Sequence, residues 1–134
     1  MTEKSIYDEI SIGFEFNKVE MLLDEATVQT IAESAQWQGD PIVDGQGNLA
    51  PGLTIAHHAH MKFDTLPQVK ATIWAKSEHE FIHPLKINQT ITIKGKIIDK
   101  FTKRDRKYLV SEYQTTDESG QILMKSCETS VHVE

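Results

Sequence analysis

Three histidines lie close together in a segment that is otherwise largely apolar. His57, His58 and His60 belong to residues 49–63, whose composition is that of a buried helix. The imidazole group changes charge near neutral pH, so it can act as a general base or acid. Gly52 stands at the start of this segment, where unpaired backbone amides can polarise a carbonyl that approaches closely. The segment is therefore a candidate site both for proton transfer and for binding a carbonyl group or an anion.

Helical spacing divides the three histidines. His57 and His60 are three residues apart and share a face with Leu53, whereas His58 points elsewhere. Each histidine has a second interpretation, in which the ring fills the core and bonds to a backbone carbonyl. Side chains of adjacent helical residues point about 100 degrees apart, which suits a metal ion poorly. We expect no metal site and no cofactor.

The elements that must position these residues differ on the two sides of residue 70. With 134 residues the chain fits one domain, 1–134. A strand or loop is expected around residues 6–16, and a helix is expected from Asp24, with apolar residues such as Val28 and Ile31 on one face. A turn-rich segment, residues 39–48, leads to the histidine segment.

Beyond residue 70 the sequence predicts strands. The run 69–83 contains no glycine or proline, and residues 90–93 alternate strictly between polar and apolar types. The alternation slips at Ile97 and Ile98, which indicates a bulge. Turns at 103–107 and 117–120 separate two further strands, 108–116 and 121–133. A helix followed by four antiparallel strands is an α+β pattern in which the sheet curls around a long central helix.

That order is typical of the hot-dog fold, and from about Ile10 to Val133 the chain resembles the MaoC-like dehydratases and (R)-specific enoyl-CoA hydratases. Residues 79–92 are similar to the family's Phe-x-x-Pro-Val/Leu-x-x-Gly-Asp-Thr-Leu turn. Asn88 and Gln89 stand where Gly-Asp is usual, and Asn also tolerates the left-handed backbone conformation of such a turn. Gly120 and the start of the histidine segment add to the resemblance.

The resemblance implies a thioester of coenzyme A or acyl carrier protein, bound in a tunnel between two subunits, and a place in fatty acid metabolism. It also implies hydration or dehydration by an Asp/His pair in a Gly-Asp-x-Asn-Pro-x-His segment. In the corresponding residues 39–44, Asp40 matches the aspartate and Pro41 the proline, but Val43 or Asp44 stands where the histidine belongs.

Three interpretations follow from this departure. In the first, Asp40 works with His57 or His60, while Asp40 or Asp44 orients the imidazole. The amide of Gly52 then polarises the thioester carbonyl, and the adjacent Pro51 and Leu53 complete the substrate-binding segment.

In the second interpretation the chain keeps the acyl pocket without the chemistry. It then acts as an acyl-thioester binder or as the silent subunit of a hetero-oligomer. In the third it is a thioesterase, which would need a carboxylate on the central helix. Between Pro51 and Phe63 there is none; Asp64 follows only at the far end, although Asp40 could approach from the loop.

Composition restricts the partners. The formal charge of −6 argues against a nucleic-acid surface, and no run is apolar enough to cross a bilayer. Cys127 is the only cysteine, so a cytoplasmic location is expected, and Cys127 is interpreted as a small buried hydrophobe. A curled sheet leaves an edge strand uncovered, which predicts a homodimer or a higher homo-oligomer.

A basic run marks the turn at 103–107. It comprises Lys100, Lys103, Arg104, Arg106 and Lys107. These side chains could meet the phosphates of coenzyme A, or they could form an ordinary solvated turn.

Overall fold

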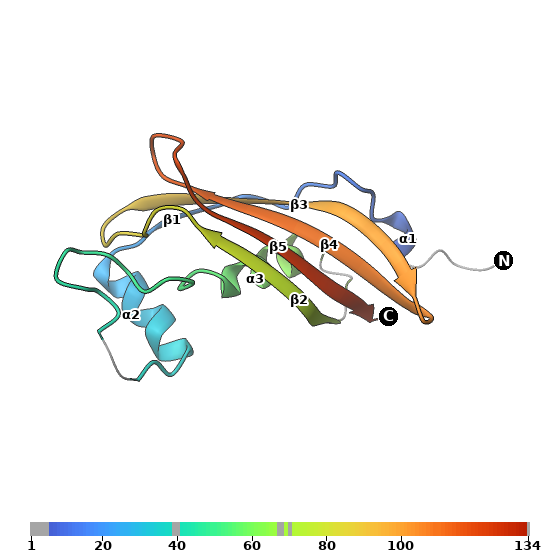
Figure 1. Cartoon of the computed structure of the whole chain (residues 1–134), viewed down its shortest axis with the longest axis horizontal. Coiled ribbons are helices and arrows are strands. Elements are labelled where there is room, and N and C mark those ends of the chain that lie inside the picture. Colours follow the sequence, from blue (N-terminus) through green and yellow to red (C-terminus); the bar gives the residue numbers. More distant parts are fainter. Residues whose placement is uncertain (1–5, 39–40, 67–68, 70, 134) are drawn as a thin grey trace.

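A five-stranded antiparallel sheet dominates the computed structural model, which describes residues 6–38, 41–66, 69 and 71–133. The elements are α1 (Ile6–Glu9), β1 (Val19–Leu22), α2 (Glu25–Ser34), α3 (Ala56–Thr65), β2 (Ala71–Phe81), β3 (Thr90–Lys103), β4 (Arg106–Thr116) and β5 (Ile122–Val133). The strand order is β1-β3-β4-β5-β2, so β1 and β2 are the edges. Figure 1 shows the long strands curving together, with α3 against them and α2 beyond the end of β2. This is the predicted α+β arrangement.

Local chemistry accounts for several boundaries that the sequence predicts. The side chain of Asp24 caps α2 by accepting a hydrogen bond of 2.8 Å from the backbone amide of Thr27. The register of β3 against β4 shifts between Ile97 and Asp99, which confirms the bulge. Asn88 has a φ of 64°, the left-handed conformation expected of this turn.

Two expectations about the first half of the chain are wrong. Residues 6–9 form the short helix α1 in place of the expected strand or loop, whereas residues 10–16 are loop, with one isolated bridge from Glu15 to Lys96. The histidine helix begins at Ala56, because residues 51–55 form turns and Gly52 has a φ of +79°. Nor is α3 buried all round, since an open sheet covers only the face that carries His58, Met61 and Lys62.

The inner face of the sheet is apolar along β3. Ile91, Ile93 and Ile97 are completely buried there. Gly95 lies between them at a position where the ring of Tyr113 packs directly against the backbone. A Cβ atom on Gly95 would lie 2.5 Å from that ring, so this close approach requires glycine.

Beyond Met124, the inner face along β5 is polar. The buried positions alternate as Ser126, Glu128, Ser130 and His132. Cys127 falls out of phase with them and is only partly buried, so its interpretation as a core residue is wrong. The face of β5 that is buried is therefore not the one with most hydrophobic residues. The polar face can be buried because α3 supplies hydrogen-bond partners for Glu128 and Ser130.

Candidate functional site

An apolar pocket of about 250 Å³ lies between the turns before α3 and the end of β2. It is lined by Leu49, Pro51, Gly52, Phe81, Ile82, His83, Pro84, Leu85, Leu123 and Met124. Gly52 allows a close approach at its rim, because a Cβ atom there would lie 3.1 Å from the side chain of Ile55 and 3.8 Å from the ring of Phe81. The backbone amide of Gly52 has no hydrogen-bond acceptor among the described residues. An apolar cavity with an available amide donor can hold a chain that ends in a carbonyl group.

The residues predicted to bind substrate are only partly brought together. Pro51 and Gly52 line the pocket, whereas the side chain of Leu53 is buried in the core. Neither His57 nor His60 lines it. Asp40, the predicted catalytic aspartate, lies outside the described residues.

His57 and His60 contact each other on α3. Their rings meet edge to face, with centroids 5.6 Å apart. His60 is exposed, and His57 is half-buried. Burial, followed by the neighbouring His60 and His58, lowers the pKa of His57. This favours the neutral imidazole that a general base requires.

Asp44 has a structural role. Its Oδ1 accepts hydrogen bonds from the backbone amides of Gln46 at 2.8 Å and Asn48 at 2.9 Å. These bonds lower the pKa of the Asp44 carboxyl and close the turn that precedes Leu49. The amide of Leu49 then donates to the carbonyl of Leu85 at 2.7 Å, which joins two walls of the pocket. Asp44 therefore shapes the pocket and does not orient a histidine.

A buried polar cluster connects α3 to the sheet. His58 Nδ1 lies 2.5 Å from Glu128 Oε2, and the His58 ring stacks on Tyr113 at 4.2 Å. One turn further along, Lys62 Nζ donates to Ser130 Oγ at 3.1 Å. Burial lowers the pKa of Lys62, and the charge of Glu128 opposes that change. His58 is thus a core residue, paired with a carboxylate rather than with a carbonyl.

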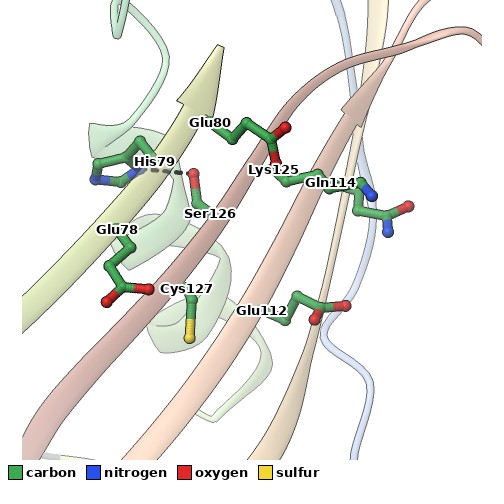
Figure 2. A pocket seen from close by; sticks show the side chains of 8 residues that line it. All are labelled: Glu78, His79, Glu80, Glu112, Gln114, Lys125, Ser126 and Cys127. Atoms are coloured by element: carbon green, nitrogen blue, oxygen red, sulfur yellow. Dashed lines mark hydrogen bonds between the residues drawn. The ribbon is translucent and has the colours of Figure 1, made fainter. Parts of the chain in front are cut away.

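A histidine paired with a serine lies at the sheet edge, and the sequence did not predict this pair. His79 Nδ1 is 2.7 Å from Ser126 Oγ across β2 and β5, as Figure 2 shows. The His79 ring is half-buried, and its centroid lies 6.3 Å from that of Phe81, which lines the apolar pocket. The alternation of side chains along β2 could have indicated that His79 lies next to Phe81, since it places both residues on one face of the strand.

The outer face of the same strands carries a polar hollow of about 260 Å³. Figure 2 shows Glu78 and Glu112 on either side of Cys127, and Glu80 further along β2 beside Lys125. Burial and then Glu78 and Glu112 raise the pKa of the Cys127 thiol, so it is a poor nucleophile. No cluster of three metal-ligating side chains occurs in the part of the chain that the structure describes.

The basic turn lies far from the apolar pocket. Along β5, seven residues separate the partner of Phe81, Met124, from the partner of Tyr108, Val131. At about 3.3 Å per residue this is roughly 23 Å, and the turn lies beyond Tyr108. Lys100 has a structural role, since its Nζ donates to the carbonyls of Tyr7 and Ile10 at 2.7 and 2.8 Å.

Comparisons with known proteins establish the fold. No protein-family model and no curated protein matches the sequence. Among solved structures, the (R)-hydratase of A. caviae involved in PHA biosynthesis superposes with a TM-score of 0.71 at 11% identity, over 90% of this chain and 96% of that one. The MaoC-like dehydratase of Rhodospirillum rubrum gives 0.71 at 14% identity, over 95% and 96%. A hypothetical thioesterase of Streptococcus pneumoniae, solved with coenzyme A, gives 0.63 at 13% identity, over 92% and 82%.

These structures confirm the hot-dog fold that the sequence predicts. At such low identities the likeness concerns the fold alone. Within the described residues, no helix is long and apolar enough to span a membrane.

Proposed function

We propose that this chain binds an acyl thioester of coenzyme A or acyl carrier protein and hydrates or dehydrates it at the enoyl or 3-hydroxyacyl stage. The observation that carries the proposal is the apolar pocket beside the Pro51–Gly52 turn. Its walls suit an acyl chain, and the amide of Gly52 is available to the thioester oxygen. The hot-dog fold shared with an (R)-hydratase and a MaoC-like dehydratase supports the same reaction class.

The size of the pocket indicates an acyl group of moderate length. An apolar cavity of roughly 150 Å³ is enough to hold benzene. The pocket of about 250 Å³ is larger by more than half, so it suits a chain of several carbons better than an acetyl group.

A homodimer through β2 is part of the proposal. Within the part of the chain that the structure describes, strand β2 pairs only with β5, which leaves its other edge open. Ile73, Trp74 and Phe81 on or at the end of this strand are 59%, 50% and 52% exposed. Long edge strands with exposed apolar side chains are normally covered. Because Phe81 and Ile82 also line the pocket, a second copy on this edge would help to close it. We place this dimer in the cytoplasm, acting in fatty acid metabolism.

A non-catalytic acyl-thioester-binding subunit is the second candidate. It is favoured by Val43 and Asp44, which stand where the resembling family has its histidine, and by the use of Asp44 in a turn. A thioesterase is less well supported. Asp64 is exposed at the far end of α3, and the buried carboxylate beside α3, Glu128, is paired with His58.

Purified protein should be mixed with crotonyl-CoA and longer enoyl-CoA thioesters, while thermal unfolding is followed with saturated acyl-CoA. We expect loss of the enoyl chromophore and a raised Tm. Stabilisation without hydration would favour the binding subunit, and release of free thiol would favour the thioesterase. Neither binding nor reaction would contradict the proposal.

A matched pair of variants tests the location. Ile82 lines the pocket and is 39% exposed, so Ile82→Trp can add bulk there without filling the core. Ile12→Trp adds the same ring at a position that is 60% exposed and does not line the pocket. We expect weaker acyl-CoA binding in the first variant only. Equal effects of the two variants would place the acyl site elsewhere.

A further inference from the structure

The inner face of β2 places a histidine, His79, next to Phe81, which lines the apolar pocket. Alternation along the strand places Ser77, His79 and Phe81 on this face and Glu78 and Glu80 on the other. Phe81 extends from the pocket wall to within 3.8 Å of the position of a Cβ atom on Gly52. His79 is the next residue on the same face, so its ring lies beside the ring that borders the Gly52 turn.

The His79 ring is held at one nitrogen and available at the other. Nδ1 lies 2.7 Å from the hydroxyl of Ser126, which is only 3% exposed and therefore fixed within the sheet (Figure 2). Nε2 has no hydrogen-bond partner among the described residues. When the proton is on Nδ1 and is donated to Ser126, Nε2 carries a lone pair. An imidazole oriented in this way is the arrangement of a general base.

The other histidines near the pocket lack this combination. His58 is completely buried and paired with Glu128, so no ligand can reach its ring. His60 is exposed and contacts only the ring of His57 among the recorded interactions of the described residues. His83 lines the pocket, but it is exposed and its ring has no hydrogen-bond partner among the described residues. Among the histidines of the described residues, His79 alone has a ring held by a buried hydroxyl while it remains half-exposed at the sheet edge.

We propose, on the basis of the hydratase function above, that His79 transfers the proton in the reaction and that Ser126 positions it. In the resembling family, proton transfer involves a histidine of the segment that corresponds to residues 39–44, where this chain has Val43 or Asp44 instead. His79 would take over that role. Nε2 accepts a proton from water as the water oxygen bonds to C3 of the enoyl group. The electron pair of the C2–C3 double bond moves to the thioester oxygen, where the Gly52 amide stabilises the enolate. The enolate then takes the same proton from Nε2 at C2, which completes the addition of one water.

The position at the edge also explains why His79 is half-exposed. Among the described residues, no strand pairs with the outer side of β2, so a ligand or a second subunit can reach the ring. A partner on β2 would enclose His79 together with Phe81 and exclude bulk water from the mouth of the pocket. The same surface would then serve assembly and chemistry.

The test compares His79→Asn with His60→Asn in the full chain. Asparagine at 79 can keep the hydrogen bond to Ser126 but has no titrating nitrogen in place of Nε2. We expect the kcat of His79→Asn for enoyl-CoA hydration to fall by about 100-fold to 10,000-fold. Its Kd for saturated acyl-CoA and its Tm should match the wild type, and His60→Asn should retain near-normal rates.

Ser126→Ala separates positioning from structure. Loss of the hydroxyl should lower kcat by about 10-fold or more with little change in KM, and should move the acidic limb of the pH–rate profile.

If wild type hydrates enoyl-CoA and His79→Asn does so equally well, the His79 assignment is overturned while the proposed function stands. If wild type binds acyl-CoA but hydrates nothing, the assignment and the hydratase activity both fall and acyl-thioester binding survives. If wild type neither binds nor reacts, the proposed function fails as a whole.

Discussion

The two halves of the sheet's inner face are built from different chemistry. Along β3 the buried side chains are the isoleucines 91, 93 and 97, and the packing is close enough that Gly95 has no room for a Cβ atom. Beyond Met124, the buried positions along β5 are Ser126, Glu128, Ser130 and His132, with His58 and Lys62 facing Glu128 and Ser130 from α3. The same fold therefore has one apolar half and one polar half.

The difference separates residues that stabilise the fold from residues kept for another reason. Burying apolar area stabilises a protein, whereas a buried ion pair often adds no net stability. The polar half lies against α3 and the edge strand β2, on the side of the apolar pocket. We infer that the apolar half supplies most of the stability and that the polar half is retained for function.

Removing a buried charge should have the largest effect. Glu128→Ala leaves His58 without its partner and Lys62 without the charge that opposes its low pKa. We expect the free energy of unfolding to fall by about 3–5 kcal/mol. Urea denaturation followed by circular dichroism measures this, and a loss below about 1 kcal/mol would show that the cluster is not a buried ion network.

Replacing the whole cluster sharpens the same comparison. A triple variant, His58→Leu, Lys62→Met and Glu128→Leu, removes the three ionisable groups together and keeps apolar volume in their place. We expect it to recover most of the stability that Glu128→Ala loses, because no unpaired charge remains. A triple variant less stable than Glu128→Ala would mean that the fold itself depends on the polar groups.

Truncation in the apolar half should cost slightly less than the broken ion pair. Ile93 is completely buried, so Ile93→Ala should lower the free energy of unfolding by about 3 kcal/mol through lost burial and a residual cavity. The measurement is again urea denaturation, with Ile12→Ala as the control because Ile12 is 60% exposed. Similar losses for the two variants would contradict the location of the core.

Overpacking at Gly95 should have a smaller effect. A methyl group would meet the rings of Tyr113 at 2.5 Å and Phe16 at 2.9 Å, so Gly95→Ala should cost about 1–3 kcal/mol. Tm by calorimetry measures the loss. Gly45→Ala is the matched control, since nothing lies within 4 Å of its added methyl group. An unchanged Tm for Gly95→Ala would show that the rings do not pack there.

The smallest expected effect concerns pH. The folded-state pKa of His57 is lowered by burial, so below about pH 6.5 the unfolded chain binds the proton more readily. The free energy of unfolding should therefore fall as pH drops from 7 to 5, by a fraction of a kcal/mol through this half-exposed group.

The variant His57→Gln should reduce that slope, and His83→Gln, at an exposed position, should leave it unchanged. Denaturation curves at the two pH values provide the measurement. If the free energy of unfolding fell more steeply with decreasing pH in His57→Gln than in wild type, the lowered pKa of His57 would be contradicted.

Much of the fold could be predicted from local patterns, because those patterns have local causes. The Asp24 cap, the bulge after Ile97 and the left-handed Asn88 each follow from the chemistry of a few residues. The long alternating strands then leave few arrangements open.

The orientation of β5 could not be predicted in this way. After Met124 its hydrophobic residues, Cys127, Val131 and Val133, favour one face, yet the polar residues of the other face are the buried ones. What decides between the two faces is the pairing of Glu128 with His58, seventy residues away in the sequence. The pair formed by His79 and Ser126 could not be predicted for the same reason, since only the register of β2 against β5 brings these two residues together.

One double variant tests most directly whether the polar half serves function rather than stability. His79→Leu with Ser126→Ala replaces the edge pair by apolar groups, and both its unfolding free energy and its rate of enoyl-CoA hydration should be measured against wild type. The account predicts unchanged or higher stability together with loss of hydration. Lower stability with hydration intact would contradict it.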